Sequence, residues 1–258
     1  MTTNSLRIAM GQMAVEPGQA EKNLTTAVRM IGEASEQGCQ VIVLPECMDL
    51  GWTYADAAAL ALPIPGDYSD RLCNAAKEYQ IYIVAGLTER SGDKLYNAAV
   101  LIDPNGDIIL KYHKINELSI AENLYAKGGS LAVAETPLGT IGVNICADNW
   151  PPHNDLGHAL GMMGTKLLLS PSSWAVRPEH SDEEEYYGLP WQNSYMELAK
   201  RSGMTVIGVS NVGPVVGGAW DGWKCIGCSL AVGSDGEVLV RGPYGEQAEE
   251  LIVVEVSV

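Results

Sequence analysis

Apolar residues recur along the chain at spacings that alternate between those of strands and those of helices. Residues 6–13 form a short apolar run that predicts a strand. Residues 21–37 carry apolar side chains at helical spacing, and Gly38 ends the predicted helix. Residues 41–44 are continuously apolar, as in a strand that is buried on both faces. The chain therefore opens with a predicted βαβ unit.

The same alternation continues through the rest of the chain. Two turn sequences, Asp-Pro-Asn-Gly at 103–106 and Gly-Ser-Asp-Gly at 233–236, predict a hairpin in each half. No repeat, linker or low-complexity stretch interrupts the pattern, which favours α/β layers in one domain over residues 1–258. The further predicted helices are 67–79, 153–163 and 190–202, and the further predicted strands are 81–86, 97–103, 107–112, 140–145, 166–170, 205–209, 226–232 and 237–240.

Composition narrows the classes of partner. Sixteen basic against 32 acidic residues give a net charge of -16, which disfavours nucleic acid and anionic membrane surfaces. No apolar run approaches the ~20 residues that cross a bilayer, and the first residues lack the pattern of a signal peptide. Six cysteines are too sparse for a disulfide scaffold and are expected to be reduced. We therefore expect a cytoplasmic protein.

Three polar residues stand at the ends of apolar strands, where α/β sheets place reacting groups. Glu46 follows the run 41–45, Lys114 follows 108–113 and Cys146 follows 141–145. A thiol attacks a carbonyl carbon only once it is deprotonated, and the oxyanion that forms must be stabilised. A glutamate can take the proton, and a lysine ammonium can stabilise the negative charge. The three residue types together predict acyl-transfer chemistry.

Three short stretches resemble the signatures of the carbon-nitrogen hydrolase (nitrilase-like) superfamily, in the family's order: Leu44-Pro-Glu46, Tyr112-His-Lys114 and Asn144-Ile-Cys-Ala-Asp148. Segments 7–13, 168–174 and 227–256 are also similar, so the resemblance covers nearly the whole chain. It implies a four-layer αββα sandwich that needs no cofactor and forms a homodimer or larger homo-oligomer. It further implies Glu46 as general base, Lys114 as oxyanion stabiliser and Cys146 as nucleophile of a thioester intermediate.

The family usually has a second glutamate after the lysine, and two residues compete for this role. Glu122 begins the segment 122–128, which is similar to the family's acidic-aromatic-glycine stretch. Glu117 is nearer to Lys114 in sequence but lacks the aromatic and the glycine that follow. The resemblance favours Glu122.

The segment after the cysteine departs from the family's common pattern. Trp150 stands where many members carry an arginine that binds a substrate carboxylate, which disfavours N-carbamoyl amino acids. Residues 146–149 partly resemble the Cys-Trp-Glu-Asn of true nitrilases. Aromatic and polar residues after the sheet or the cysteine are the expected substrate-binding walls: Tyr54, Asn149, Trp150 and Trp174, with Trp191 as a further candidate.

The leading hypothesis is hydrolysis of a small amide to an acid and ammonia or an amine. A nitrilase, an N-carbamoyl amine hydrolase and a catalytically silent regulatory member remain as alternatives. A Cys-His hydrolase with His113 as base is disfavoured, because neighbours on a strand point to opposite faces. The four histidines and the pair Cys225 and Cys228 show no complete metal-binding spacing, so no metal is expected.

Overall fold

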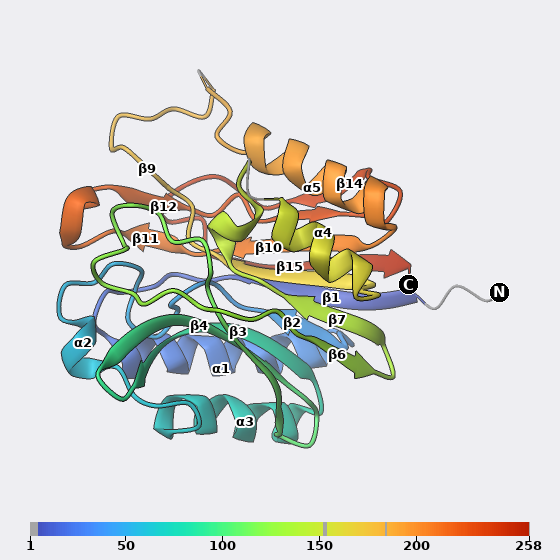
Figure 1. Cartoon of the computed structure of the whole chain (residues 1–258), viewed down its shortest axis with the longest axis horizontal. Helices are drawn as coiled ribbons and strands as arrows, with labels where there is room; N and C mark the ends of the chain where they lie inside the picture. The colour runs from blue at the N-terminus through green and yellow to red at the C-terminus, as the bar shows by residue number, and fades with distance from the viewer. Residues whose placement is uncertain (1–4, 152–153, 184, 258) are drawn as a thin grey trace.

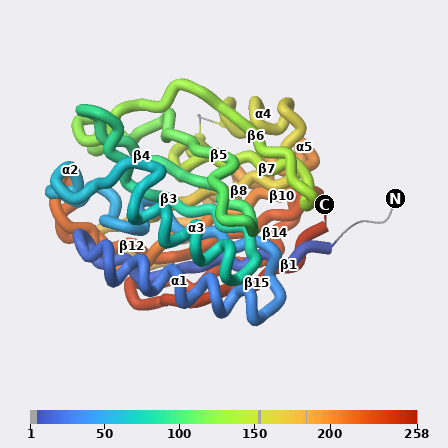
Figure 2. Tube along the Cα trace, turned by 90° about the horizontal axis from the view of Figure 1, so that it is seen from below, coloured from blue at the N-terminus to red at the C-terminus, as the bar shows by residue number. Residues whose placement is uncertain are grey.

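The computed structural model describes residues 5–151, 154–183 and 185–257. Two six-stranded sheets pack face to face, and a pair of helices covers the outer face of each (Figure 1). Seen from below, α1 and α3 lie side by side over the first sheet, with α4 and α5 at the far side (Figure 2). The predicted four-layer αββα sandwich is confirmed.

The first half builds the sheet of order β15-β1-β2-β3-β4-β5. Strands β1, β2 and β3 run parallel, while β4, β5 and β15 add antiparallel edges. In β2 the side chains alternate, so that Val41 and Val43 pack between the sheets while Ile42 packs toward the helices. The elements are β1 (Ser5–Gln12), α1 (Ala20–Glu36), β2 (Val41–Val43), α2 (Ala57–Leu60), α3 (Asp67–Tyr79), β3 (Tyr82–Ser91), β4 (Lys94–Ile102), β5 (Ile108–His113) and β15 (Glu250–Ser257).

The second half repeats this plan in a sheet of order β14-β13-β10-β8-β7-β6, with β7, β8 and β10 parallel. A small sheet, β11-β12-β9, lies beyond one end. The elements are β6 (Val133–Thr136), β7 (Gly139–Val143), η1 (Cys146–Asn149), α4 (Asp155–Met162), β8 (Leu167–Ser172), β9 (Ala175–Val176), α5 (Leu189–Ser202), β10 (Thr205–Ser210), β11 (Val212–Pro214), η2 (Gly218–Trp220), β12 (Lys224–Ile226), β13 (Leu230–Val232) and β14 (Val238–Arg241).

One apolar core joins the two sheets. Ile8 and Val84 of the first sheet belong to the same buried cluster as Ile141, Leu168 and Val206 of the second. The carboxyl ends of β2 and β7 therefore meet at one end of the sandwich. Within the described ranges, no helix is long and apolar enough to cross a membrane.

The structure departs from the predicted elements in a few places. The predicted strand 226–232 is wrong in its middle, because Gly227 and Cys228 have φ angles of 68° and 60° that separate β12 from β13. Strand β15 was not predicted as an element. The start of the predicted helix at His153 lies outside the described residues. Both predicted hairpins are present, as β4–β5 and β13–β14.

Candidate active site

Glu46 lies where the first sheet touches the second. Its backbone N–H donates to the carbonyl oxygen of Ser172 in β8 at 3.2 Å, which ties the end of β2 to the opposite sheet. Gly86 of β3 passes directly behind it, and a Cβ atom on Gly86 would lie 2.5 Å from the Glu46 Cα. The close approach of β3 is therefore possible only with glycine at this position.

The Glu46 carboxylate and the Lys114 ammonium form a buried ion pair. Lys114 Nζ lies 2.6 Å from Glu46 Oε1, and each side chain is 1% exposed. Asn97 Nδ2 in β4 donates to the same oxygen at 2.6 Å. Glu46 Oε2 accepts no hydrogen bond from any residue in the described ranges. One carboxylate oxygen is thus fixed, while the other is open to a proton.

Cys146 is the first residue of the turn η1, which follows β7, and its φ of 44° lies in the left-handed region. The Asp148 carboxylate holds this turn by accepting from the Ile145 backbone N–H at 3.0 Å and from the Tyr112 hydroxyl at 2.8 Å. The Cys146 N–H donates to Ser170 Oγ at 3.2 Å. These contacts hold the Cys146 backbone in a left-handed conformation that residues other than glycine rarely adopt without such support.

The charges around the thiol define its resting state. Burial raises the pKa of Cys146, as does the nearby Glu46 carboxylate, while Lys114 and the backbone N–H of Ser173 oppose the rise without cancelling it. Burial alone would lower the pKa of Lys114, but Glu46, Glu117 and Cys146 together raise it well above its ordinary value. The resting site therefore holds a protonated thiol beside a permanent ammonium.

The structure places the two candidates for the second glutamate differently relative to Lys114. Glu117 Oε2 lies 3.8 Å from Lys114 Nζ, and the Glu117 side chain is fully buried. Glu122 is 44% exposed and pairs with Lys127 at 2.9 Å. From the segment that suggested Glu122, it is Tyr125 that points inward, where its hydroxyl accepts from the Thr53 N–H at 3.2 Å.

Burial of Glu117 has a measurable consequence. The low-polarity surroundings raise its pKa to about 7, because the neighbouring Glu46 and Asp148 carboxylates add to the effect of burial and Lys114 only partly offsets it. The cluster thus contains one lysine, one paired carboxylate and a second carboxyl group that binds a proton near neutral pH.

A pocket of about 320 Å³ opens over Cys146. Of the expected substrate-binding residues, Trp150 lines it, as does Trp191. Asn149 is instead buried in an amide pair with Asn144, and Trp174 stacks behind Trp191 at 4.9 Å. Tyr54 packs in a separate apolar cluster. The pocket residues are Leu118, Cys146, Ala147, Trp150, Ser173, Ala175, Tyr187, Trp191, Trp220 and Trp223.

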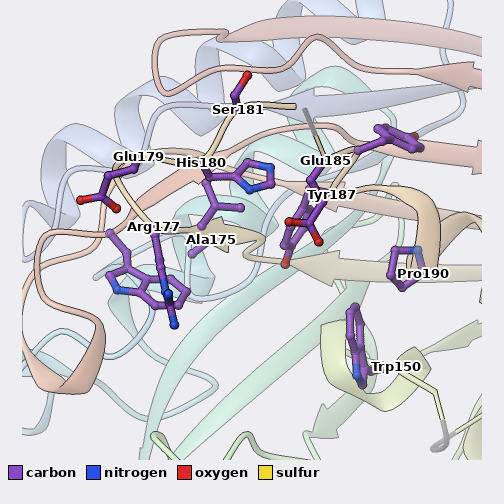
Figure 3. A pocket seen from close by; sticks show the side chains of 12 residues that line it. Trp150, Ala175, Arg177, Glu179, His180, Ser181, Glu185, Tyr187 and Pro190 are labelled. Atoms are coloured by element: carbon purple, nitrogen blue, oxygen red, sulfur yellow. The ribbon is translucent and has the colours of Figure 1, made fainter. Parts of the chain in front are cut away.

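An outer pocket of about 810 Å³ adjoins the inner one and shares four lining residues with it: Trp150, Ala175, Tyr187 and Trp223. Figure 3 shows Arg177, Glu179, His180 and Glu185 around this outer space. Charged side chains are thus present in the approach to the site.

Sequence reasoning missed Asn97, Tyr187, Trp220 and Trp223. Trp220 and Trp223 belong to the irregular segment between β11 and β12, where hydrophobic spacing carries no information. The sequence carried one signal for them, since a chain without phenylalanine contains six tryptophans. In the structure, four of these tryptophans line the pocket over Cys146.

The position of His113 bears on the Cys-His alternative. Its Nε2 lies 2.5 Å from Glu89 Oε2, and its ring stacks on Tyr96 with a centroid distance of 3.9 Å. The imidazole is therefore engaged by the β3–β4 hairpin and not by Cys146.

Comparison with known proteins shows the family of the chain. Residues 7–258 match the model of the family described as carbon-nitrogen hydrolase, and the chain belongs to that family, a member of the nitrilase superfamily. It is 34% identical over 174 residues to a protein named nitrilase from Pyrococcus abyssi, an alignment that covers 65% of each chain. It is 32% identical over 179 residues to omega-amidase NIT2 of Xenopus tropicalis, covering 65% of this chain and 63% of that one. The aligned part is thus slightly under two thirds of these relatives' length.

Solved structures show the same fold. A carbon-nitrogen hydrolase from Helicobacter pylori G27 superposes with a TM-score of 0.85 at 22% identity, covering 98% of this chain and 89% of that one. An amidase from Nesterenkonia sp. gives a TM-score of 0.80 at 22% identity, covering 98% and 90%. At these identities the likeness concerns the fold.

Proposed function

We propose that the protein hydrolyses a small amide to a carboxylic acid and ammonia or an amine, through a thioester on Cys146. The observation that carries the proposal is the buried pair of Glu46 Oε1 and Lys114 Nζ, 2.6 Å apart, next to a protonated thiol that opens onto a pocket. The amidase names of several relatives support amides as the substrate class.

The proposed first half-reaction forms the thioester. Glu46 takes the proton from Cys146 as the sulfur attacks the amide carbon, and the carbonyl π electrons move onto oxygen. The Lys114 ammonium stabilises this oxyanion and keeps its own proton, since its pKa is far above neutral. The tetrahedral adduct then collapses, and the leaving nitrogen takes the proton from Glu46.

The second half-reaction releases the acid. Water replaces the departed amine, Glu46 takes one of its protons, and the resulting hydroxide attacks the thioester carbon. Collapse of the second adduct breaks the C–S bond, and the sulfur recovers its proton from Glu46. The net reaction consumes one water for each amide bond, and the enzyme returns to its starting state.

The test uses two cysteine variants that differ in their place in the fold. Cys146→Ala should lose turnover to the level of the blank, because no other cysteine in the described ranges lines the pocket. Cys73→Ala, at a half-buried thiol away from this site, should keep it. Ammonia release from a panel of short amides is measured, with mass spectrometry of quenched enzyme for the acyl adduct. Undiminished turnover by Cys146→Ala overturns the mechanism.

A nitrile is the second candidate substrate, because the relative from Pyrococcus abyssi carries the name nitrilase. The same thiol would add to the nitrile carbon and form a thioimidate. Matched amides and nitriles of the same acyl group separate the two activities by which of them yields ammonia. N-carbamoyl amines belong in the same panel. A catalytically silent member would show neither turnover nor an acyl adduct with any of these compounds.

We also propose that the chain acts as a cytoplasmic homodimer or larger homo-oligomer. Six free thiols suit a reducing compartment. Analytical ultracentrifugation of the purified chain tests the assembly.

A further inference from the structure

The pocket over Cys146 is walled by aromatic rings. Trp150 directly follows η1, and Trp191 lies on α5. Trp220 and Trp223 come from the segment between β11 and β12, and Tyr187 from the segment before α5. Among the described residues that line it, none carries a charge. Charged side chains are found in the outer pocket, where Arg177 and Glu179 lie (Figure 3).

The rings support one another and so form fixed walls. Trp220 and Trp223 stack with centroids 4.1 Å apart and an interplanar angle of 9°. Trp150 meets Trp191 edge-on at 4.8 Å, and Trp174 stacks behind Trp191. A pocket shaped in this way before binding favours a group that fills it by apolar contact.

A substrate with a charged acyl group should bind weakly in this pocket. Glu46 and Lys114 are already paired with each other, and each is 1% exposed. The Arg177 guanidinium lies 5.8 Å from the centroid of the Trp223 ring, but Arg177 lines the outer pocket and not the inner one. A carboxylate held inside the inner pocket would lose its hydration without gaining a charged partner among the residues that line it. Aromatic rings can attract an ammonium group, but no carboxylate lines these walls, and the Lys114 ammonium close to Cys146 would repel it.

We infer that the substrate's acyl group is uncharged and apolar, a chain of several carbons or a phenyl ring. This inference rests on the proposed amide hydrolysis and names its substrate class. The volume of about 320 Å³ corresponds to about ten water volumes of ~30 Å³ each, which leaves room for such a group. It sets the chain apart from enzymes that act on amides of dicarboxylic acids.

Matched amides test the inference by charge at constant shape. Hexanamide and 5-aminopentanamide differ by a methyl against an ammonium, and 4-methylpentanamide and succinamate differ by an isopropyl group against a carboxylate. For each pair we expect kcat/KM to favour the neutral amide by at least about 100-fold. From acetamide to hexanamide, kcat/KM should rise about fourfold per methylene. A preference for succinamate or for 5-aminopentanamide overturns the inference.

A variant in the wall tests the cause of the preference. Trp220→Ala should lower the ratio of kcat/KM for hexanamide over acetamide by about tenfold or more, because one apolar wall is lost. Val216→Ala, on the same segment but 42% exposed and outside the pocket, is the matched control and should keep the ratio. Circular dichroism confirms that both variants fold. An unchanged ratio in Trp220→Ala contradicts the inference.

The failure of this inference can be told from the failure of the proposed function. If some amides are hydrolysed but chain length brings no gain, only the apolar acyl class is wrong. If no amide or nitrile gives ammonia release that depends on Cys146, the proposed function itself is wrong.

Discussion

Asn97 shares with Lys114 the task of fixing one oxygen of the Glu46 carboxylate, which leaves the other oxygen open. Its Nδ2 donates to Glu46 Oε1 at 2.6 Å, and its Oδ1 lies 3.5 Å from the Cys47 thiol, which sets the orientation of the amide. We predict that Asn97→Ala lowers kcat by about 10- to 100-fold, because Glu46 keeps only Lys114 to hold it. Steady-state kinetics on the best amide measures this. A kcat within twofold of the parent's would show that Lys114 alone positions the carboxylate.

Glu117 makes the stability of the protein depend on pH. Its pKa rises from 4.5 to about 7 on folding, so between these values the folded chain binds more protons than the unfolded chain. The free energy of unfolding should therefore fall as pH rises from 4.5 to 7, by on the order of 3 kcal/mol from this group. Glu117→Gln mimics the protonated form and should remove that part of the fall. Asp49, whose burial raises its pKa to about 7, keeps its own contribution.

Urea unfolding at pH 5, 6, 7 and 8 measures this slope. Glu117→Gln should match the parent near pH 5 and exceed it at pH 8. Glu122→Gln, at an exposed side chain, is the matched control and should follow the parent at every pH. An equally steep fall in Glu117→Gln would place the titration elsewhere.

The sequence predicted the candidate site residues unevenly. Glu46, Lys114 and Cys146 follow apolar strands directly, so the rule that strand ends carry reacting groups was enough to expect them together. Glu117 and Glu122 lie in a loop, where the fold of the chain decides which carboxylate turns inward. Asn97 lies within a strand, and its polar contact depends on a partner 51 residues away.

At the scale of elements, β3 passes close behind the end of β2, next to the site. A Cβ atom on Gly86 would lie 2.5 Å from Glu46 Cα and 2.6 Å from the Pro45 carbonyl oxygen, both of them backbone atoms. We predict that Gly86→Ala lowers the free energy of unfolding by about 2–4 kcal/mol and reduces activity by about 100-fold, since Glu46 must move. Urea unfolding and kinetics measure the two effects.

Gly129→Ala is the matched control for this prediction. No heavy atom lies within 4 Å of a Cβ placed there, so its stability should change by less than about 0.5 kcal/mol. Equal behaviour of Gly86→Ala and Gly129→Ala would mean that β2 and β3 adjust without strain.

Elements with regular hydrophobic periodicity could be predicted from the sequence. Elements that depend on pairing with a distant part of the chain could not. The helical spacing of 21–37 gave α1 within one residue, since one face of the helix must be buried against the sheet. Strand β15 was missed because it is an edge strand, defined by its pairing with β1 some 240 residues earlier. The break after Ile226 depends on two left-handed residues, one of which is Cys228.

At the scale of the whole molecule, two features join the two halves of the chain. The cluster between the sheets contains residues of both, and β15 from the end of the chain pairs with β1 along its full length. Neither half could bury its inner sheet face alone. This supports the prediction of a single domain and argues against two independently folding halves.

Unfolding should therefore be one cooperative transition in which both sheets are lost together. Far-UV circular dichroism reports on the strands and helices of both halves. Tryptophan fluorescence reports mainly on the region where the halves meet. The ring centroids of Trp52 in the first half and Trp220 in the second are 5.4 Å apart. We predict that the two signals give the same urea midpoint at any one pH, and that Cys146→Ala leaves this agreement unchanged. Separate midpoints would show that the halves unfold independently and that the site is lost before the fold.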